Sequence, residues 1–163
     1  MTIQLYEELS DCMDKEAGCY RQLVVLALRQ KELLVAAKIQ ELPVNVQQEE
    51  KQVFSLGPLV SRRNELLQEM AKSLEMKTMN LSQAMEKAPG EVAVRFREAA
   101  LRLVESAKEL ESVNQGNDKL LKNALSYVNF TLKAISSGGR PSVAARMEKG
   151  TEKPASSFLN RKV

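Results

Sequence analysis

The chain of 163 residues has no histidine and no tryptophan, only two cysteines, and few glycines and prolines (seven and five). Without histidine it has no imidazole ligand for a metal and no Ser-His or Cys-His pair that could activate a nucleophile. The scarcity of glycine argues against phosphate-binding loops and turn-rich β structure. We therefore expect no catalytic centre, no metal, no cofactor and no enzymatic activity.

The two cysteines, Cys12 and Cys19, are seven residues apart. On one helix this spacing separates them by about 10.5 Å along the axis, more than the roughly 7 Å between Cα atoms that a disulfide allows. We interpret both as small apolar core residues. The chain also has no secretion signal at its start and no apolar stretch near the ~20 residues of a membrane span. A cytoplasmic protein without stable membrane insertion is expected.

What the chain does contain is 44% hydrophobic residues and an excess of good helix formers such as Leu, Ala, Glu and Lys. Apolar residues recur every seven positions from Thr2 to about Lys38, from about 43 to 77, and from about 91 to 135. Each stripe is about three positions wide per heptad, which is typical of a helix in a bundle. We therefore predict an all-α fold, an elongated antiparallel bundle of three long helices over residues 1–135.

The heptad rows of the first two long helices differ in how many of their positions are apolar. The second long helix carries the most regular row, in which every seventh residue is apolar: Ile39, Val46, Val53, Val60, Leu67, Leu74 and Leu81. The first helix has two solid rows beside a mixed one, which consists of Leu9, Glu16, Leu23, Gln30 and Ala37. Two solid rows and a mixed one together make a stripe about three positions wide per heptad.

Proline, glycine and asparagine mark the connections between helices. Pro43 suits the first turn of the second helix, while Gly57-Pro58 lies inside its heptad pattern. Because the heptad phase continues across Gly57-Pro58, we favour a kinked helix over a loop there. Asn80 with Gln83 three residues later resembles a capping box, which predicts a short extra helix.

The end of the third long helix is apolar on nearly every face, with eight large apolar residues: Leu120, Leu121, Leu125, Tyr127, Val128, Phe130, Leu132 and Ile135. Such a helix needs more burial than one neighbouring face supplies, so either further helices or a partner must cover it. The pattern stops at Ser136, and residues 136–163 contain six Lys or Arg and two Glu. We predict a separate, disordered basic tail, in which Phe158-Leu159 is either solvated or a short docking peptide.

Asn114 and Asn117 occupy adjacent core-facing positions of the third long helix, with Gly116 between them. Amides in an apolar seam cost stability unless they are hydrogen-bonded, and a glycine inside a helix costs roughly a further 1 kcal/mol. Three interpretations are open: a helix break capped by the two Asn, a polar layer that sets the register between helices, or a direct binding role.

At this block the sequence resembles the FlgN family of flagellar export chaperones. The signature is two Asn three residues apart, then paired Leu, then a Leu-x-Tyr-Val-like apolar run near the end of a long last helix. Here it reads Leu110-Glu111-Ser112-Val113-Asn114-Gln115-Gly116-Asn117-Asp118-Lys119-Leu120-Leu121, followed by the run from Ala124 to Leu132. More weakly, the whole chain is similar, with Lys51 and Arg62-Arg63 on the polar side of the second helix.

The resemblance implies a cytosolic, ATP-independent chaperone that binds the C-terminal helices of hook–filament junction proteins and prevents their premature assembly. It also implies delivery to the type III export apparatus, through contacts with the export gate or the ATPase complex. Some family members use a tail Tyr at the gate, where this tail has Phe158 as its only aromatic. The implied partner-binding residues are Asn114, Asn117, Leu120, Leu121, Leu125, Tyr127, Val128, Phe130, Leu132, Ile135 and Phe158.

The heptads alone fit a second hypothesis, a structural coiled-coil tether or homodimerising adaptor without an export role, and the oligomeric state is left open. Nucleic-acid binding is not expected, because the charge of the tail is modest and aromatic residues are not interleaved with the basic ones. Carboxylates such as Glu105, Glu109 and Glu111 indicate a solvated helix face.

Overall fold

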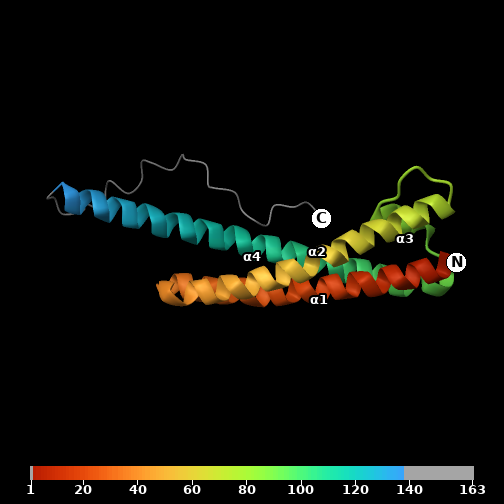
Figure 1. Cartoon of the computed structure of the whole chain (residues 1–163), viewed down its shortest axis with the longest axis horizontal. Helices are drawn as coiled ribbons and strands as arrows, with labels where there is room; N and C mark the ends of the chain where they lie inside the picture. The colour runs from red at the N-terminus through yellow and green to blue at the C-terminus, as the bar shows by residue number, and fades with distance from the viewer. Residues whose placement is uncertain (1, 138–163) are drawn as a thin grey trace. The chain divides into compact units, whose positions relative to one another are not determined.

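The computed structural model describes residues 2–137, which form helices and no strands. The elements are α1 (Thr2–Val35), a 3₁₀ turn η1 (Ile39–Glu41), α2 (Leu42–Ser73), α3 (Leu81–Lys87) and α4 (Gly90–Ser136) (Figure 1). The predicted all-α bundle of three long helices and one short helix is confirmed. The chain divides into two compact units, residues 1–117 and 118–163, so α4 begins in the first and ends in the second. The predicted division between a domain 1–135 and a tail stays a prediction.

The connections between α1, α2 and α3 differ in part from those expected. α2 continues through Pro58, so the kinked-helix interpretation of Gly57-Pro58 is right in placing a helix there and the loop alternative is wrong. α1 and α2 end earlier than predicted, before Ala37 and Glu75, which have positive φ values of 55° and 54°. At both ends an amide N–H reaches back five residues to a carbonyl, Lys38 to Leu33 and Met76 to Ala71, and caps the helix.

The first unit packs α2 and α4 against α1. Cys12 of α1 lies against the Leu59 carbonyl, and Leu26 against Asn45, so α1 and α2 are antiparallel. Asp14 of α1 pairs with Arg102 of α4, and the Ala27 carbonyl accepts from Asn117, so α1 and α4 are parallel. This is the up-down order of a bundle whose first and third long helices run the same way.

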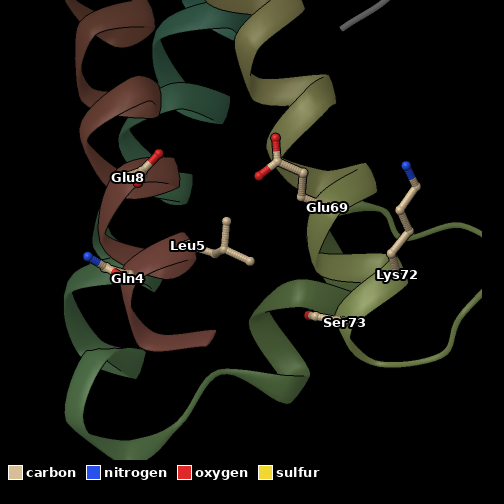
Figure 2. Close-up of a pocket in the computed structure, with 6 residues that line it drawn as sticks. All are labelled: Gln4, Leu5, Glu8, Glu69, Lys72 and Ser73. Carbon is tan, nitrogen blue, oxygen red and sulfur yellow. The ribbon is translucent and has the colours of Figure 1, made fainter. Parts of the chain in front are cut away.

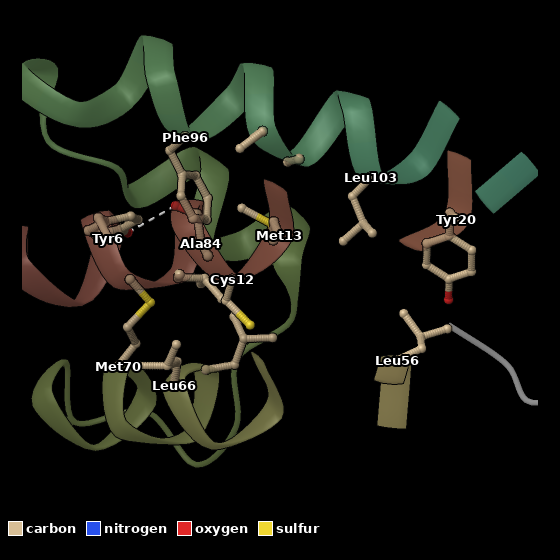
Figure 3. Close-up of a cluster of buried hydrophobic side chains, with 14 of the residues drawn as sticks. Tyr6, Cys12, Met13, Tyr20, Leu56, Leu66, Met70, Ala84, Phe96 and Leu103 are labelled. Carbon is tan, nitrogen blue, oxygen red and sulfur yellow. Dashed lines mark hydrogen bonds between the residues drawn. The ribbon is translucent and has the colours of Figure 1, made fainter. Parts of the chain in front are cut away.

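The core is centred on the N-terminal half of α1 (Figure 3). The rings of Tyr6 and Phe96 meet edge to face, with centroids 4.9 Å apart. Tyr6 Oη donates to the Ala84 carbonyl at 2.9 Å, which ties α3 to α1. Met13 of α1 and Met70 of α2 fill the space beside these rings, and both are fully buried.

The short helix α3 begins with the capping box that the sequence predicts. The Gln83 amide donates to Asn80 Oδ1 at 2.8 Å, and the Asn80 amide donates to Gln83 Oε1 at 3.0 Å. Two amides at the start of the helix are thereby satisfied. The capping box fixes where α3 begins and so positions Ala84 under Tyr6.

Candidate partner-binding surface

The described residues bring together no group that suggests a reaction centre. Within 2–137 no three or more Cys, Asp or Glu side chains lie close enough to hold a metal ion. An open depression between α1 and α2 is lined by Gln4, Leu5, Glu8, Glu69, Lys72 and Ser73 (Figure 2). The Ser73 hydroxyl donates to the Met70 carbonyl of its own helix. Cys12 and Cys19 are both free thiols, as the spacing predicts.

The first half of α4 is seated in the core by one apolar stripe. Phe96, Ala99, Leu103 and Leu110 follow one another at helical spacing and all are buried. Asn117 extends the same stripe and is the last residue of the first unit. Up to Asn117, therefore, α4 is an ordinary amphipathic helix whose apolar face is covered.

Beyond Asn117 the same stripe continues along α4 but is exposed. Its members recur at spacings of four and three, and they are between 40% and 72% exposed: Leu121, Leu125, Val128, Leu132 and Ile135. Of the other predicted residues, Tyr127 is exposed, whereas Leu120 and Phe130 are half-buried. We call the five stripe residues the α4 stripe. Phe158 lies outside the described residues.

The Asn pair lies at the boundary between the covered and the exposed parts of α4. Asn117 is 3% exposed, and its Nδ2 donates to the Ala27 carbonyl at 2.7 Å and to Gln30 Oε1 at 3.1 Å. Its Oδ1 is buried without a hydrogen-bond partner. Asn114 is half-buried. Because α4 runs through both residues unbroken, the helix-break interpretation is wrong, and the Asn117 contacts match a polar layer that fixes α4 against α1.

Sequence reasoning missed one charged pair. Arg63, which was expected on the polar side of the second helix, is buried, and its Nε lies 3.4 Å from Oε1 of the fully buried Glu16. Burial raises the pKa of Glu16 from 4.5 to about 7, although the nearby Arg63 lowers it. Heptad spacing indicated that both residues are buried. Glu16 is seven residues from Leu9 and Leu23, and Arg63 is seven residues from Leu56 and Met70.

The described residues thus define an all-helical protein, in which a long last helix carries an exposed apolar stripe. The family whose model matches the chain over residues 1–153 is described as FlgN protein. The chain belongs to the FlgN family, which comprises chaperones of flagellar assembly, and the resemblance seen in the sequence is confirmed. Comparisons with curated proteins and with solved structures gave no match. Among the described helices, none is long and apolar enough to cross a membrane.

Proposed function

We propose that the protein is a cytoplasmic, ATP-independent chaperone that binds the C-terminal helices of hook–filament junction proteins. It keeps these helices from assembling early and hands them to the type III export apparatus. The observation that carries the proposal is the exposed α4 stripe, which continues a buried stripe without a change of spacing. An amphipathic client helix recognises this kind of surface through apolar side chains at helical spacing.

The energetics of the stripe support a helix-binding role. Leu125 and Val128 are 58% and 47% exposed. Since full burial of such a side chain contributes about 1.5–3 kcal/mol, covering the exposed half contributes about 1 kcal/mol for each. Five such residues together contribute about 5 kcal/mol, which is near the lower end of the roughly 4–15 kcal/mol that association costs, so the apolar side chains of the client must supply the rest. The position of Asn117, fixed by the Ala27 carbonyl, anchors the helix from which the stripe extends.

The proposal is tested with the double variant Leu125→Asp/Val128→Asp in the full chain. Two desolvated carboxylates in the interface are expected to weaken binding of a purified C-terminal fragment of a junction protein at least 100-fold, measured by isothermal titration calorimetry. The matched control is Asn123→Asp/Ser126→Asp, which adds the same charge to exposed positions off the stripe of the same helix. The circular dichroism spectra of both variants must match that of the wild type. Wild-type affinity in the Leu125→Asp/Val128→Asp variant would show that the α4 stripe is not the client surface.

The same stripe also fits the second candidate, a homodimerising tether. This candidate requires that the chain self-associate through Leu125 and Val128 without a client. Sedimentation equilibrium of the free protein separates the two functions. A firm dimer that Leu125→Asp/Val128→Asp dissociates favours the tether, whereas a monomer that binds the client fragment favours the chaperone.

A further inference from the structure

The covered side of α2 changes in character at Gly57-Pro58. After Pro58 the buried residues of this helix are apolar apart from Arg63: Leu66, Leu67, Met70 and Ala71. Before Pro58 the buried and half-buried residues recur at spacings of three and four, and three of the five are polar: Leu42, Asn45, Glu49, Gln52 and Leu56. We call residues 42–57 the α2 arm. Because apolar burial is the main force that holds helices together, the arm is held less firmly than the rest of α2.

Most of the large apolar side chains of the arm add nothing to its attachment. Four of them are exposed, Phe54 to 85%: Val44, Val46, Val53 and Phe54. The contact with α1 is made instead by Asn45, whose Nδ2 donates to the Leu26 carbonyl at 3.0 Å and to Glu49 Oε1 at 3.3 Å. Since water can replace hydrogen bonds of this kind at little net cost, the arm can leave α1 more easily than an apolar helix could.

The arm joins the rest of α2 at a weak point of the helix backbone. Pro58 has no amide hydrogen, so the Phe54 carbonyl loses its donor four residues on, and the proline ring crowds the preceding turn. Gly57 restrains the backbone less than any other residue type. A Cβ on Gly57 would have no packing neighbour within 4 Å, so packing does not require glycine there. The pair makes residues 57–58 a joint at which α2 can bend.

The contacts of α2 with α1 place Glu16 beneath the last turn of the arm. The Cys12 thiol donates to the Leu59 carbonyl at 3.3 Å. Further along α1, the Leu26 carbonyl accepts from Asn45. Because the two helices are antiparallel, each step forward from Cys12 along α1 corresponds to a step back from Leu59 along α2. Glu16, four residues after Cys12, thus lies opposite the turn of α2 that ends the arm.

Glu16 and Arg63 form a buried pair without the hydrogen bonds that such a pair needs. Glu16 is fully buried, and neither of its carboxylate oxygens has a hydrogen-bond partner among the described residues. Arg63 Nε, which lies 3.4 Å from Glu16 Oε1, has no hydrogen-bond partner there either. An ionised carboxylate in this setting loses its hydration and gains little in exchange. Ionisation of Glu16 therefore favours any opening of α2 that admits water.

The groups around Glu16 leave it as the one that changes charge near neutral pH. The charged group that faces it from α2 is Arg63. Its titratable neighbours on α1 are Cys12, Cys19 and Tyr20. Burial, and then the charge of Glu16, raise the pKa of all three, so they stay protonated near pH 7. From α4, Arg102 lies at the level of Asp14, to which its guanidinium donates at 3.0 and 2.9 Å.

We propose that the α2 arm is a conformational switch, which swings away from α1 about Gly57-Pro58 and opens more often when Glu16 is ionised. The rest of α2 stays in place, since Leu66 and Met70 are buried in the core. In the open state water reaches the Glu16 carboxylate, and in the closed state the arm excludes it. The switch is separate from the α4 stripe and does not rest on the proposed function.

Hydrogen exchange of the full chain, read by mass spectrometry, measures opening separately in the two halves of α2. Because a helix as short as the arm is marginal by itself, a detached arm loses its helix and its amides exchange. Protection is the ratio of the intrinsic to the measured exchange rate, so the effect of pH on the exchange chemistry cancels. At about pH 8 the protection of residues 46–57 is expected to be at least about tenfold lower than that of residues 62–71.

The pH dependence of the opening follows from Glu16. Burial raises its pKa in the closed state from 4.5 to about 7, whereas solvation in the open state returns it to about 4.5. The closed state therefore binds more protons, and the protection of the arm is expected to fall roughly 70-fold between about pH 5 and about pH 8. Glu16→Gln, which cannot ionise, is expected to abolish most of this fall. Glu49, whose pKa burial also raises, is present in both proteins, so the difference between them reports Glu16.

A second variant tests the joint. Gly57→Ala/Pro58→Ala restores the missing helix hydrogen bond at two exposed positions and is expected to raise the protection of the arm at least about tenfold. Gln47→Ala/Gln48→Ala, also at exposed positions of the arm, is the matched control. It leaves the joint unchanged and is expected to change the protection less than about threefold.

Three results would overturn the inference. Equal protection in both halves of α2, with the same dependence on urea, would show that the arm opens only when the whole first unit unfolds. The same fall of arm protection with pH in the wild type and in Glu16→Gln would remove Glu16 from the switch. Unchanged protection in Gly57→Ala/Pro58→Ala would remove the joint. None of these results bears on client binding by the α4 stripe.

Discussion

The buried pair of Glu16 and Arg63 makes stability depend on pH in a direction opposite to that of an ordinary surface carboxylate. The folded chain holds the Glu16 proton to about pH 7, whereas the unfolded chain releases it near 4.5. The folded state therefore binds more protons between these values, and stability falls as the pH rises through this window. The contribution of Glu16 is complete below about 4.5 and is lost above about 7.

The magnitude follows from the same two pKa values. The change from 4.5 to about 7 corresponds to about 3 kcal/mol, at about 1.4 kcal/mol for each pKa unit. Since the Glu16 side chain is fully buried, this value needs no reduction for solvent screening. Glu16→Gln mimics the protonated acid at every pH. The variant is expected to exceed the unfolding free energy of the wild type by about 1 kcal/mol at about pH 5 and by about 3 kcal/mol at about pH 8.

Urea unfolding followed by circular dichroism at about pH 5 and about pH 8 measures this difference. Because the chain has no histidine, no histidine titration contributes to the change of stability between these two pH values. Burial also raises the pKa of Glu49, but this residue is common to both proteins and cancels in the comparison. Glu109→Gln, at an exposed position, is the matched control and should leave the pH dependence unchanged. An equal gap between Glu16→Gln and wild type at both pH values would refute the reasoning.

Substitutions at three further residues test contacts that hold the first unit together, each by urea unfolding of the full chain. Asn117→Ala removes the donor to the Ala27 carbonyl and should lower the unfolding free energy by about 1–3 kcal/mol; no change would mean that the polar layer does not hold α4. Tyr6→Phe keeps the ring on Phe96 but loses the bond to Ala84, which is expected to cost about 1 kcal/mol, and an unchanged value would show that this bond is not needed. Asn80→Ala should cost about 1 kcal/mol, whereas Asn80→Asp, which keeps a capping oxygen, should cost less; equal losses would contradict the capping role.

The helices could be predicted from the sequence because heptad spacing and helix propensity agree along the chain. The ends of α1 and α2 could not, because both helices are closed by residues other than glycine. Ala37 and Glu75 adopt the left-handed conformation at a steric cost that the five-residue amide contacts of the next residues offset. Nothing in the identity of Ala or Glu indicates such a cap.

Some parts of the candidate site could be predicted from the sequence, and others could not. The α4 stripe follows from spacing alone, since Leu121, Leu125 and Val128 continue the phase of Leu110. The exposure of Val46 and Val53 in the α2 row could not be predicted. Seven apolar heptad positions indicate that burial is favourable, but the burial of each position depends on which helices pack around it, and heptad spacing does not specify this. Arg63 was misplaced because charge was weighed above heptad position.

The contacts of α1 with α3 and α4 join residues far apart in the sequence. Tyr6 and Ala84 are 78 residues apart, Asp14 and Arg102 are 88, and Ala27 and Asn117 are 90. Because domains fold from the N-terminus as they are synthesised, α1 and α2 can pair on the ribosome while the side of α1 that will receive α4 is still bare. Until Asn117 has left the ribosome, the face of α1 that packs against α4 in the folded protein stays exposed in the nascent chain.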